Sequence, residues 1–478
     1  MTYSTSFSNN FAVLLLVFCS WTLSGCSGLN VTKPQIISLQ ATKSSPQPAY
    51  SGEILWQTYV SGGTPPLTYE YRMRKNQQEK IVQSGLESTW SWQPRNSGNF
   101  HIRVRVKDKK GYISTSEWTP FRVDPAINNH HLIAFFPLEN LSGVKAPLSK
   151  ISQDYKELLQ SKGLNFLSDE RLEDFMLRHR VRYTGGIGSE LAHALREEGV
   201  EAVFITSLES YEKSVSPKIA LTSRLVLCRD FPEIAWIDGV GITGEDSPGL
   251  LGLKRIPKME NLEQKALNNL ADSFLNALSE NPEPVSKSTN GIKPRDFYLA
   301  TDFAPEGKYR VAVVPFLNRY ARRNAGFVVP LHFVNLLSKN DNLQVVEPGV
   351  VREQLLKYRL IMQAGPSLAV ADVLASETSL SADLILSGYV FDYQDQFGIP
   401  KIDFSTRLFS GPKREIIWWS RSYANGDDGV YFFDLGRHQS AHAMLEEMTQ
   451  SIGKLIFKAN KFRPQESEFE NINSIHSK

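Results

Sequence analysis

The chain has 478 residues, of which 41% are hydrophobic and 22% are charged, and its formal net charge is +2 at pH 7. This composition is ordinary for a soluble globular protein. Because 53 basic and 51 acidic residues alternate along the chain, no nucleic-acid partner is expected. No complete catalytic, metal or cofactor motif occurs, so the sequence predicts a non-catalytic protein of several domains without a cofactor.

The first 26 residues carry a targeting signal. An apolar run from Phe11 to Trp21 is followed by Leu23-Ser24-Gly25-Cys26. The run has the length of a signal-peptide core and is short for a membrane-spanning helix. The four residues form a lipobox, where a bacterial cell attaches diacylglycerol to the cysteine, cleaves before it and acylates the new amino group, often with palmitate. We therefore expect residues 1–25 to be a signal peptide and Cys26 to carry the lipid. An uncleaved anchor is the alternative, because residues 1–10 contain no Lys or Arg.

The residue after the cysteine predicts the membrane. In the bacterial lipoproteins that this segment resembles, an aspartate at that position favours retention in the inner membrane. Here the position holds Ser27, so the resemblance implies the outer membrane, with the protein facing the periplasm. Two or three acyl chains would anchor it firmly.

Residues 34–125 have an all-β pattern after a short tether at 26–33. In the longest run, Phe100, Ile102, Val104 and Val106 alternate with polar residues, as in a strand with one buried face. Several such runs, separated by Gly, Pro and Asn turns, predict a β-sandwich. The segment from 90 to 123 is similar to the end of bacterial triple-tyrosine, fibronectin-like or PKD-like modules.

An internal repeat decides the architecture of the remainder. The segment 133–140 (IAFFPLEN) matches 311–318 (VAVVPFLN) at an offset of 178 residues. Pro217-Lys218-Ile219 matches Pro400-Lys401-Ile402 at 183, and each copy ends with an amphipathic helix. The nearly constant offset predicts two duplicated α/β domains with mixed sheets, at 130–280 and 309–460. A polar segment at 281–308 is expected to be a linker, and 461–478 a disordered tail.

The repeated segments resemble a known group. The elements Val311 to Asn318, Leu343 to Glu347 and Ala382 to Gly388 are similar to those of TolB amino-terminal domains, CsgG-like curli-secretion lipoproteins and lipoprotein activators of penicillin-binding proteins. The resemblance implies that each repeat is a TolB-N/CsgG-like domain.

Candidate chemical sites have simpler interpretations. His438 and His442, with Glu446, share a helix face and could ligate a metal, but a solvated helix face is favoured. The segment 185–189 (GGIGS) could bind an anion, but a turn with Ser189 as helix N-cap is favoured. Cys228 is expected to be the one free thiol and a small buried hydrophobe.

Paired acids recur at Glu245-Asp246 and Asp427-Asp428, where turn formation is expected rather than acid–base chemistry. The candidate contact residues for a partner are Trp418, Trp419, Arg319, Arg322 and Arg323, because aromatic and arginine side chains dominate interface energetics. For the three arginines a solvated loop is favoured, and for the tryptophans a face covered by a helix is the alternative.

Together these features suggest a lipid-anchored scaffold or assembly factor for an envelope apparatus of secretion, transport or motility. Its expected partners are the membrane, through the anchor, and other envelope proteins, and a homo-oligomer is a further hypothesis. The alternative is a regulatory lipoprotein that activates a periplasmic cell-wall enzyme such as a penicillin-binding protein. An enzyme is the third hypothesis.

Overall fold

The structure is a computed structural model that describes residues 33–246, 255–279, 291–361, 365–396, 398–428 and 437–457. The predicted signal peptide, Cys26 and the tail at 461–478 lie outside these ranges. The chain forms two compact units, of which the first ends at Asp124 and the second begins at Pro125, apart from residues 95–97, which belong with the second. Within the described ranges, no helix is both long enough and apolar enough to cross a membrane.

The first unit is a sandwich of two sheets. One sheet has the order β1-β3-β6 and the other β2-β9-β7-β4-β5, with β8 paired to β7. The bounds are β1 (Gln35–Ala41), β2 (Gln47–Pro48), β3 (Ile54–Ser61), β4 (Thr68–Lys75), β5 (Gln78–Gly85), β6 (Thr89–Trp92), β7 (Gly98–Lys107), β8 (Ile113–Thr115) and β9 (Thr119–Asp124). Rings from the two sheets meet between them, since Trp56 lies 5.7 Å from Phe121 and Trp92 lies 5.0 Å from Phe100. The four apolar residues predicted on one face of the longest strand are all buried.

The second unit contains two sheets with one strand order. The first has the order β12-β10-β13-β14-β15, and the second has the order β19-β17-β20-β21-β22. In each sheet the first three strands are parallel and the last three antiparallel. The bounds in the first repeat are β10 (Leu132–Phe135), β11 (Glu139–Asn140), β12 (Asn165–Phe166), β13 (Val200–Glu212), β14 (Lys218–Leu227) and β15 (Glu233–Thr243). Those in the second are β17 (Tyr309–Val313), β18 (Leu317–Asn318), β19 (Leu343–Val345), β20 (Leu384–Gln394), β21 (Lys401–Ser410) and β22 (Glu415–Asn425). The two repeats therefore share a topology, while their membership in the TolB-N/CsgG-like group stays a prediction.

Among the described residues, one strand of the second repeat has no counterpart in the first. β16 (Asp296–Leu299) pairs with β22 and extends the second sheet at its edge. The linker predicted for 281–308 is therefore wrong for these four residues. The short run lacks the alternation of a half-buried strand, because three of its four residues are exposed.

Helices cover both faces of each sheet. The first repeat has α1 (Leu148–Ser161), α2 (Asp169–Arg178), α3 (Ser189–Glu197) and α4 (Met259–Leu278), and the second has α5 (Ala325–Ser338), α6 (Pro348–Lys357), α7 (Leu368–Ala375) and α8 (Ala441–Phe457). Along β17, Val311 and Val313 belong to the core cluster that contains α5 and α8, whereas Ala312 packs with α6 and α7. This alternation is what a strand buried on both faces requires.

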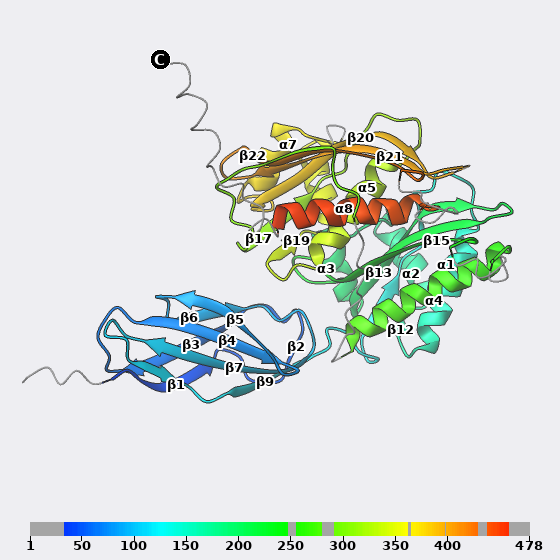
Figure 1. Cartoon of the computed structure of the whole chain (residues 1–478). Coiled ribbons are helices and arrows are strands. Elements are labelled where there is room, and N and C mark those ends of the chain that lie inside the picture. The colour runs from blue at the N-terminus through cyan, green and yellow to red at the C-terminus, as the bar shows by residue number, and fades with distance from the viewer. Residues whose placement is uncertain are drawn as a thin grey trace, which may run out of the picture. The chain divides into compact units, whose positions relative to one another are not determined.

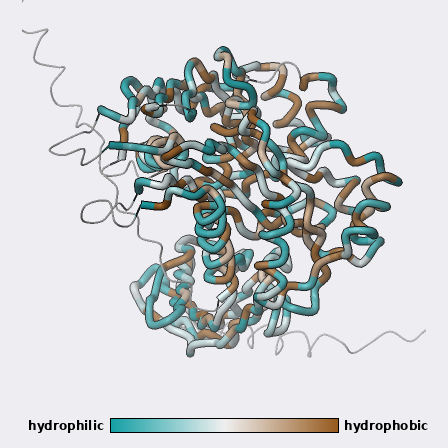
Figure 2. Tube along the Cα trace, turned by 90° about the vertical axis from the view of Figure 1, so that its right-hand side faces the viewer, coloured by the Kyte–Doolittle hydropathy of each residue, from teal (hydrophilic) through white to brown (hydrophobic). Residues whose placement is uncertain are grey.

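The pair α5 and α8 contacts both sheets of the second unit. Besides the sheet of its own repeat, it contacts β15 of the first repeat, and Figure 1 shows α8 between the two sheets. Accordingly, 11 of the 14 residues of α5 are buried. Figure 2 shows hydrophobic and hydrophilic residues interspersed along the same helices and strands. One core cluster therefore runs through both repeats.

Candidate functional site between the two repeats

Three buried polar side chains meet where α5 and α8 pack on the first repeat. Glu209 comes from β13, His332 from α5 and His442 from α8. The carboxylate Oε2 of Glu209 lies 3.1 Å from Nε2 of His332 and 2.7 Å from Nδ1 of His442. The three side chains are only 1%, 3% and 4% exposed, respectively. We call them the Glu-His-His cluster.

Local backbone features place these side chains. The register between β13 and β14 shifts between Leu208 and Ser210, so Glu209 occupies a β-bulge, a feature that re-aims a side chain. His442 lies directly against two glycines of β15. A Cβ at Gly241 would stand 2.4 Å from Cβ of His442, and one at Gly239 would stand 2.7 Å from its Cε1. Glycine is therefore required there for the close approach of α8.

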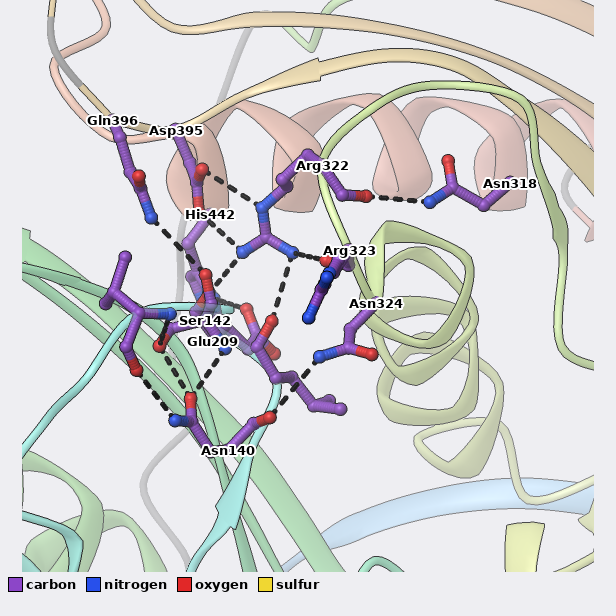
Figure 3. A network of polar contacts seen from close by, with 12 residues as sticks. Asn140, Ser142, Glu209, Asn318, Arg322, Arg323, Asn324, Asp395, Gln396 and His442 are labelled. Carbon is purple, nitrogen blue, oxygen red and sulfur yellow. Dashed lines mark hydrogen bonds and ion pairs between the residues drawn. The ribbon is translucent and has the colours of Figure 1, made fainter.

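A second layer of polar contacts surrounds the cluster. The Thr222 hydroxyl donates to the other carboxylate oxygen of Glu209. Arg322 donates to the backbone carbonyl of Glu209 and forms an ion pair with Asp395 at 2.6 Å. Figure 3 shows this arginine beside Asp395, with Glu209 and His442 close by. Further bonds across the repeats join Asn324 to the Asn140 carbonyl, Gln396 to the Ser142 carbonyl and Arg322 to the Leu141 carbonyl.

The charges of the cluster follow from burial and from these neighbours. Burial opposes ionisation of Glu209, but the two imidazoles hold the pKa of its carboxyl well below the ordinary value of 4.5. The pKa of His332 is lowered from its ordinary value, because burial and the neighbouring His442 together outweigh Glu209, which raises it. We therefore assign Glu209 as a carboxylate, and His332 as a neutral imidazole that donates to it near neutral pH.

An ion pair also crosses the repeats. Arg224 of β14 donates through Nη2 and Nε to the carboxylate of Glu347, at 2.9 and 3.1 Å, and both side chains are fully buried. The same Nη2 donates to the carbonyl of Gly185 at 2.7 Å. Since removal of one member would leave a buried charge without its partner, this pair fixes the two repeats to each other.

The glycine-rich segment 185–189 takes part in the same interface. Gly188, not Ser189, is the N-cap residue of α3, so the predicted Ser189 cap is wrong. Instead the Glu353 carboxylate of the second repeat accepts hydrogen bonds from the backbone N–H of Ser189 at 2.9 Å and of Glu190 at 3.4 Å. A helix N-terminus favours an anion, and here the same chain supplies it.

The five predicted contact residues separate into buried and exposed sets. Trp418 is fully buried, and its Nε1 donates to Thr406, because this side of β22 faces the core. The side chain of Arg322 is only 9% exposed, because it reaches into the interface between the repeats. The prediction of these two as a partner surface is therefore wrong. Trp419 is partly exposed, and Arg319 and Arg323 are exposed.

The helix-face interpretation of the two histidines is wrong for His442, which is buried in the Glu-His-His cluster. His438 lies outside the cluster and faces Glu447 at 3.7 Å, while Glu446 accepts a hydrogen bond from Gln450. Glu209 and His332 are not predicted from the sequence. A glutamate inside an apolar strand and a histidine inside an apolar helix were the available signals.

Two other expectations are confirmed. Cys228 is buried, and burial raises the pKa of its thiol to about 12, so it is a poor nucleophile. Asp246 and Asp428 each accept a hydrogen bond from the backbone N–H three residues earlier, at 2.7 Å in both cases. These acids form turns.

No protein-family model matches the chain, and no curated protein matches it. Among solved structures, the PelC dodecamer from Paraburkholderia phytofirmans is 12% identical, with a TM-score of 0.23 over 34% of this chain and 95% of that one. The LpoB C-terminal domain from Salmonella enterica is 15% identical, with a TM-score of 0.22 over 24% of this chain and 84% of that one. A fibronectin type-III domain of human fibronectin type III domain containing protein 3 is 21% identical, with a TM-score of 0.16 over 22% and 93%. These partial similarities establish neither a family nor a function.

Proposed function

We propose that this chain is a lipid-anchored protein of the bacterial cell envelope whose two α/β repeats form one rigid, non-catalytic module that binds another envelope protein. The anchor is inferred from the lipobox that ends at Cys26. The rigidity is inferred from the Arg224–Glu347 pair and the Glu-His-His cluster, which join the repeats through buried contacts.

The observation that supports the proposal is that a helical layer covers one face of β15, whereas the equivalent face of β22 stays partly exposed. In the first repeat, Ile237, Gly239 and Gly241 of β15 face the layer formed by α5 and α8. At an offset of 182 residues, β22 of the second repeat has Trp419, Arg421 and Tyr423. These side chains stay partly exposed, and Tyr423 is 41% exposed.

Stacked arginines organise the exposed face. The guanidinium of Arg421 lies 3.6 Å from the ring centre of Phe391, and that of Arg319 lies 4.4 Å from the ring centre of Tyr389. We define the arginine-aromatic face by six residues: Arg319, Tyr389, Phe391, Trp419, Arg421 and Tyr423. Aromatic and arginine side chains held in place in this way are typical of binding hot spots. A partner that presents carboxylates beside an apolar side chain fits such a face.

Two variants test the face. Trp419→Ala and Arg319→Glu in the full-length lipoprotein should each weaken capture of the native partner from detergent-solubilised membranes. A hot-spot residue contributes about 2 kcal/mol or more to binding, so retention should fall by roughly 30-fold. Arg229→Glu, at an exposed position of the first repeat, is the matched control.

The outcomes are distinct. If both face variants fold and still capture every partner that the parent and Arg229→Glu capture, the face is not the binding surface. If purified protein converts a cell-wall or lipid substrate, the non-catalytic proposal fails. Capture of a cell-wall synthase, lost in both face variants, would favour the regulatory alternative over a secretion, transport or motility scaffold.

The anchor is tested separately. Cys26→Ala should release the protein from the membrane fraction and leave the amino terminus unmodified, because the lipid attaches at that sulfur. Unchanged membrane retention together with an unchanged mass of the mature amino terminus would contradict the lipid anchor.

A further inference from the structure

We propose that Glu209, His332 and His442 bind one divalent transition-metal ion of the zinc type and that this ion cross-links the two repeats. The inference goes beyond the proposed function, because it assigns a ligand to the interior of the module and not a partner to its surface. The potential ligand atoms of the three side chains all lie within 4.8 Å of one another.

The donor atoms select the class of metal. Two imidazole nitrogens and one carboxylate oxygen suit zinc and its neighbours in the first transition row, whereas magnesium and calcium prefer sites made of oxygen alone. Three protein ligands with a water molecule in the fourth position are the coordination of catalytic zinc sites, and the same coordination can also cross-link the segments that supply the ligands.

The spacing is close to that of such a site. Zinc bonds to nitrogen and oxygen measure about 2.0–2.2 Å, so ligand atoms at tetrahedral positions lie roughly 3.3 Å apart. The two separations from Oε2 of Glu209 are 3.1 and 2.7 Å. Small side-chain adjustments would therefore let an ion lie between the three donor atoms, with each imidazole carrying its proton on the ring nitrogen that does not bind the metal.

The surroundings orient the ligands as metal sites require. Thr222 donates to the carboxylate oxygen of Glu209 that faces away from the histidines, and Arg322 donates to the backbone carbonyl of the same residue. Outer hydrogen bonds of this kind fix first-shell ligands. Gly239 and Gly241 of β15 pack directly against the His442 side chain.

The cluster is not an ordinary feature of the repeated fold. The positions equivalent to Glu209, His332 and His442 hold Phe391, Asp154 and Glu260, respectively. Asp154 and Glu260 have side chains that are 39% and 58% exposed. Burial of three polar groups is costly unless something compensates it, and a shared cation does so while joining segments that lie 123 and 233 residues from Glu209.

The first test uses the unaltered full chain, without an affinity tag, after removal of metals with EDTA. Titration with Co²⁺ should produce visible d–d absorption bands that saturate at one equivalent, and added Zn²⁺ should abolish them. Elemental analysis should then find one zinc ion per chain. Absence of the bands together with no retained zinc would overturn the proposal.

Variants locate the site. His332→Gln and His442→Gln should weaken binding of Co²⁺ by more than about 100-fold, because loss of even an outer partner weakens metal binding by about 10–100-fold. Thr222→Ala removes only such a partner, so it should retain the fold and bind about 10–100-fold more weakly. His438→Gln, on the same segment but outside the cluster, is the control. Parental affinity for Co²⁺ in Thr222→Ala together with parental affinity in His332→Gln or His442→Gln would overturn the assignment. Loss of Co²⁺ binding in His438→Gln would also overturn it.

Discussion

The two helical layers of the second unit, α1 with α4 and α5 with α8, occupy equivalent positions in their repeats but have different surroundings. The layer of α1 and α4 packs on one sheet, whereas that of α5 and α8 lies between two sheets. In α4, eight of 20 residues are buried, and the position equivalent to His442 holds Glu260, which pairs with Lys213 on the surface. In α8, ten of 17 residues are buried, and His442 contacts the other repeat.

This difference shows how one fold can supply a helical layer in one repeat and receive that layer on its sheet in the other. The first repeat accepts a helical layer because Gly239 and Gly241 leave room on its sheet. The second repeat has Arg421 and Tyr423 at those positions, which occupy the space that a helix would need. The second repeat supplies the helical layer of α5 and α8, and the first repeat supplies the face of β15 with Gly239 and Gly241 that receives it. The two repeats of one chain therefore pair with each other and need no second chain.

The largest expected effect comes from breaking the ion pair between the repeats. Arg224→Met leaves the Glu347 carboxylate buried without its partner and should lower the free energy of unfolding by about 3–5 kcal/mol. The equivalent Arg407 is only partly buried, so Arg407→Met should cost about 1 kcal/mol or less. Urea unfolding of the full chain in detergent, followed by tryptophan fluorescence, measures both.

A double variant sharpens this prediction. Replacing both partners, as in Arg224→Met with Glu347→Leu, should recover most of the lost stability, because no charge is then left buried. Equal losses in Arg224→Met and Arg407→Met would show that the ion pair does not distinguish the repeats.

The shared topology could be predicted because its central strands are apolar and recur at a nearly constant offset. Those strands include 133–140 and 311–318, and the structure gives their sheets one strand order. The strand β16 escaped prediction, because it is short and largely exposed and therefore lacks an apolar face.

The site could not be predicted, for a different reason. A repeat is detected where its two copies agree, but the cluster uses positions where they differ, such as Glu209 against Phe391. Its members are also brought together only by packing between the repeats, 123 and 233 residues along the chain. His442 was visible as a candidate, but the partners considered for it were its neighbours in sequence, His438 and Glu446.

A substitution on the face of β15 that contacts α8 should have the next largest effect on the free energy of unfolding. Gly241→Ala places a Cβ against His442 and should lower the free energy of unfolding by about 1–3 kcal/mol, as overpacking does. Tyr423→Ala, at the equivalent exposed position, should change it by about 0.5 kcal/mol or less. Thermal unfolding of both variants beside the parent tests the contrast. A neutral Gly241→Ala would mean that α8 does not approach β15 so closely.

The smallest expected effect on stability concerns the residue after β14 and its equivalent after β21. The two residues form equivalent backbone hydrogen bonds but differ in their side chains. The N–H of Cys228 donates to the Glu201 carbonyl, and that of the equivalent Gly411 donates to the Asp383 carbonyl. A side chain at Gly411 would stand 2.4 Å from the Ala382 carbonyl oxygen, whereas the first repeat has room for the buried thiol. Cys228→Ala should therefore cost only about 1 kcal/mol at pH 7.

The pH dependence of that cost identifies the buried thiol. Burial raises the pKa of the Cys228 thiol from 9.0 to about 12, so above pH 9 the unfolded chain loses this proton while the folded chain keeps it. The thiol's contribution to stability is thus complete below pH 9 and declines as the pH rises towards 12. The difference in unfolding free energy between the parent and Cys228→Ala should be constant from pH 6 to 8 and shrink by pH 10. Urea titrations of the two proteins at these pH values measure it, and a difference that stays constant to pH 10 would show that the thiol already ionises in the folded protein.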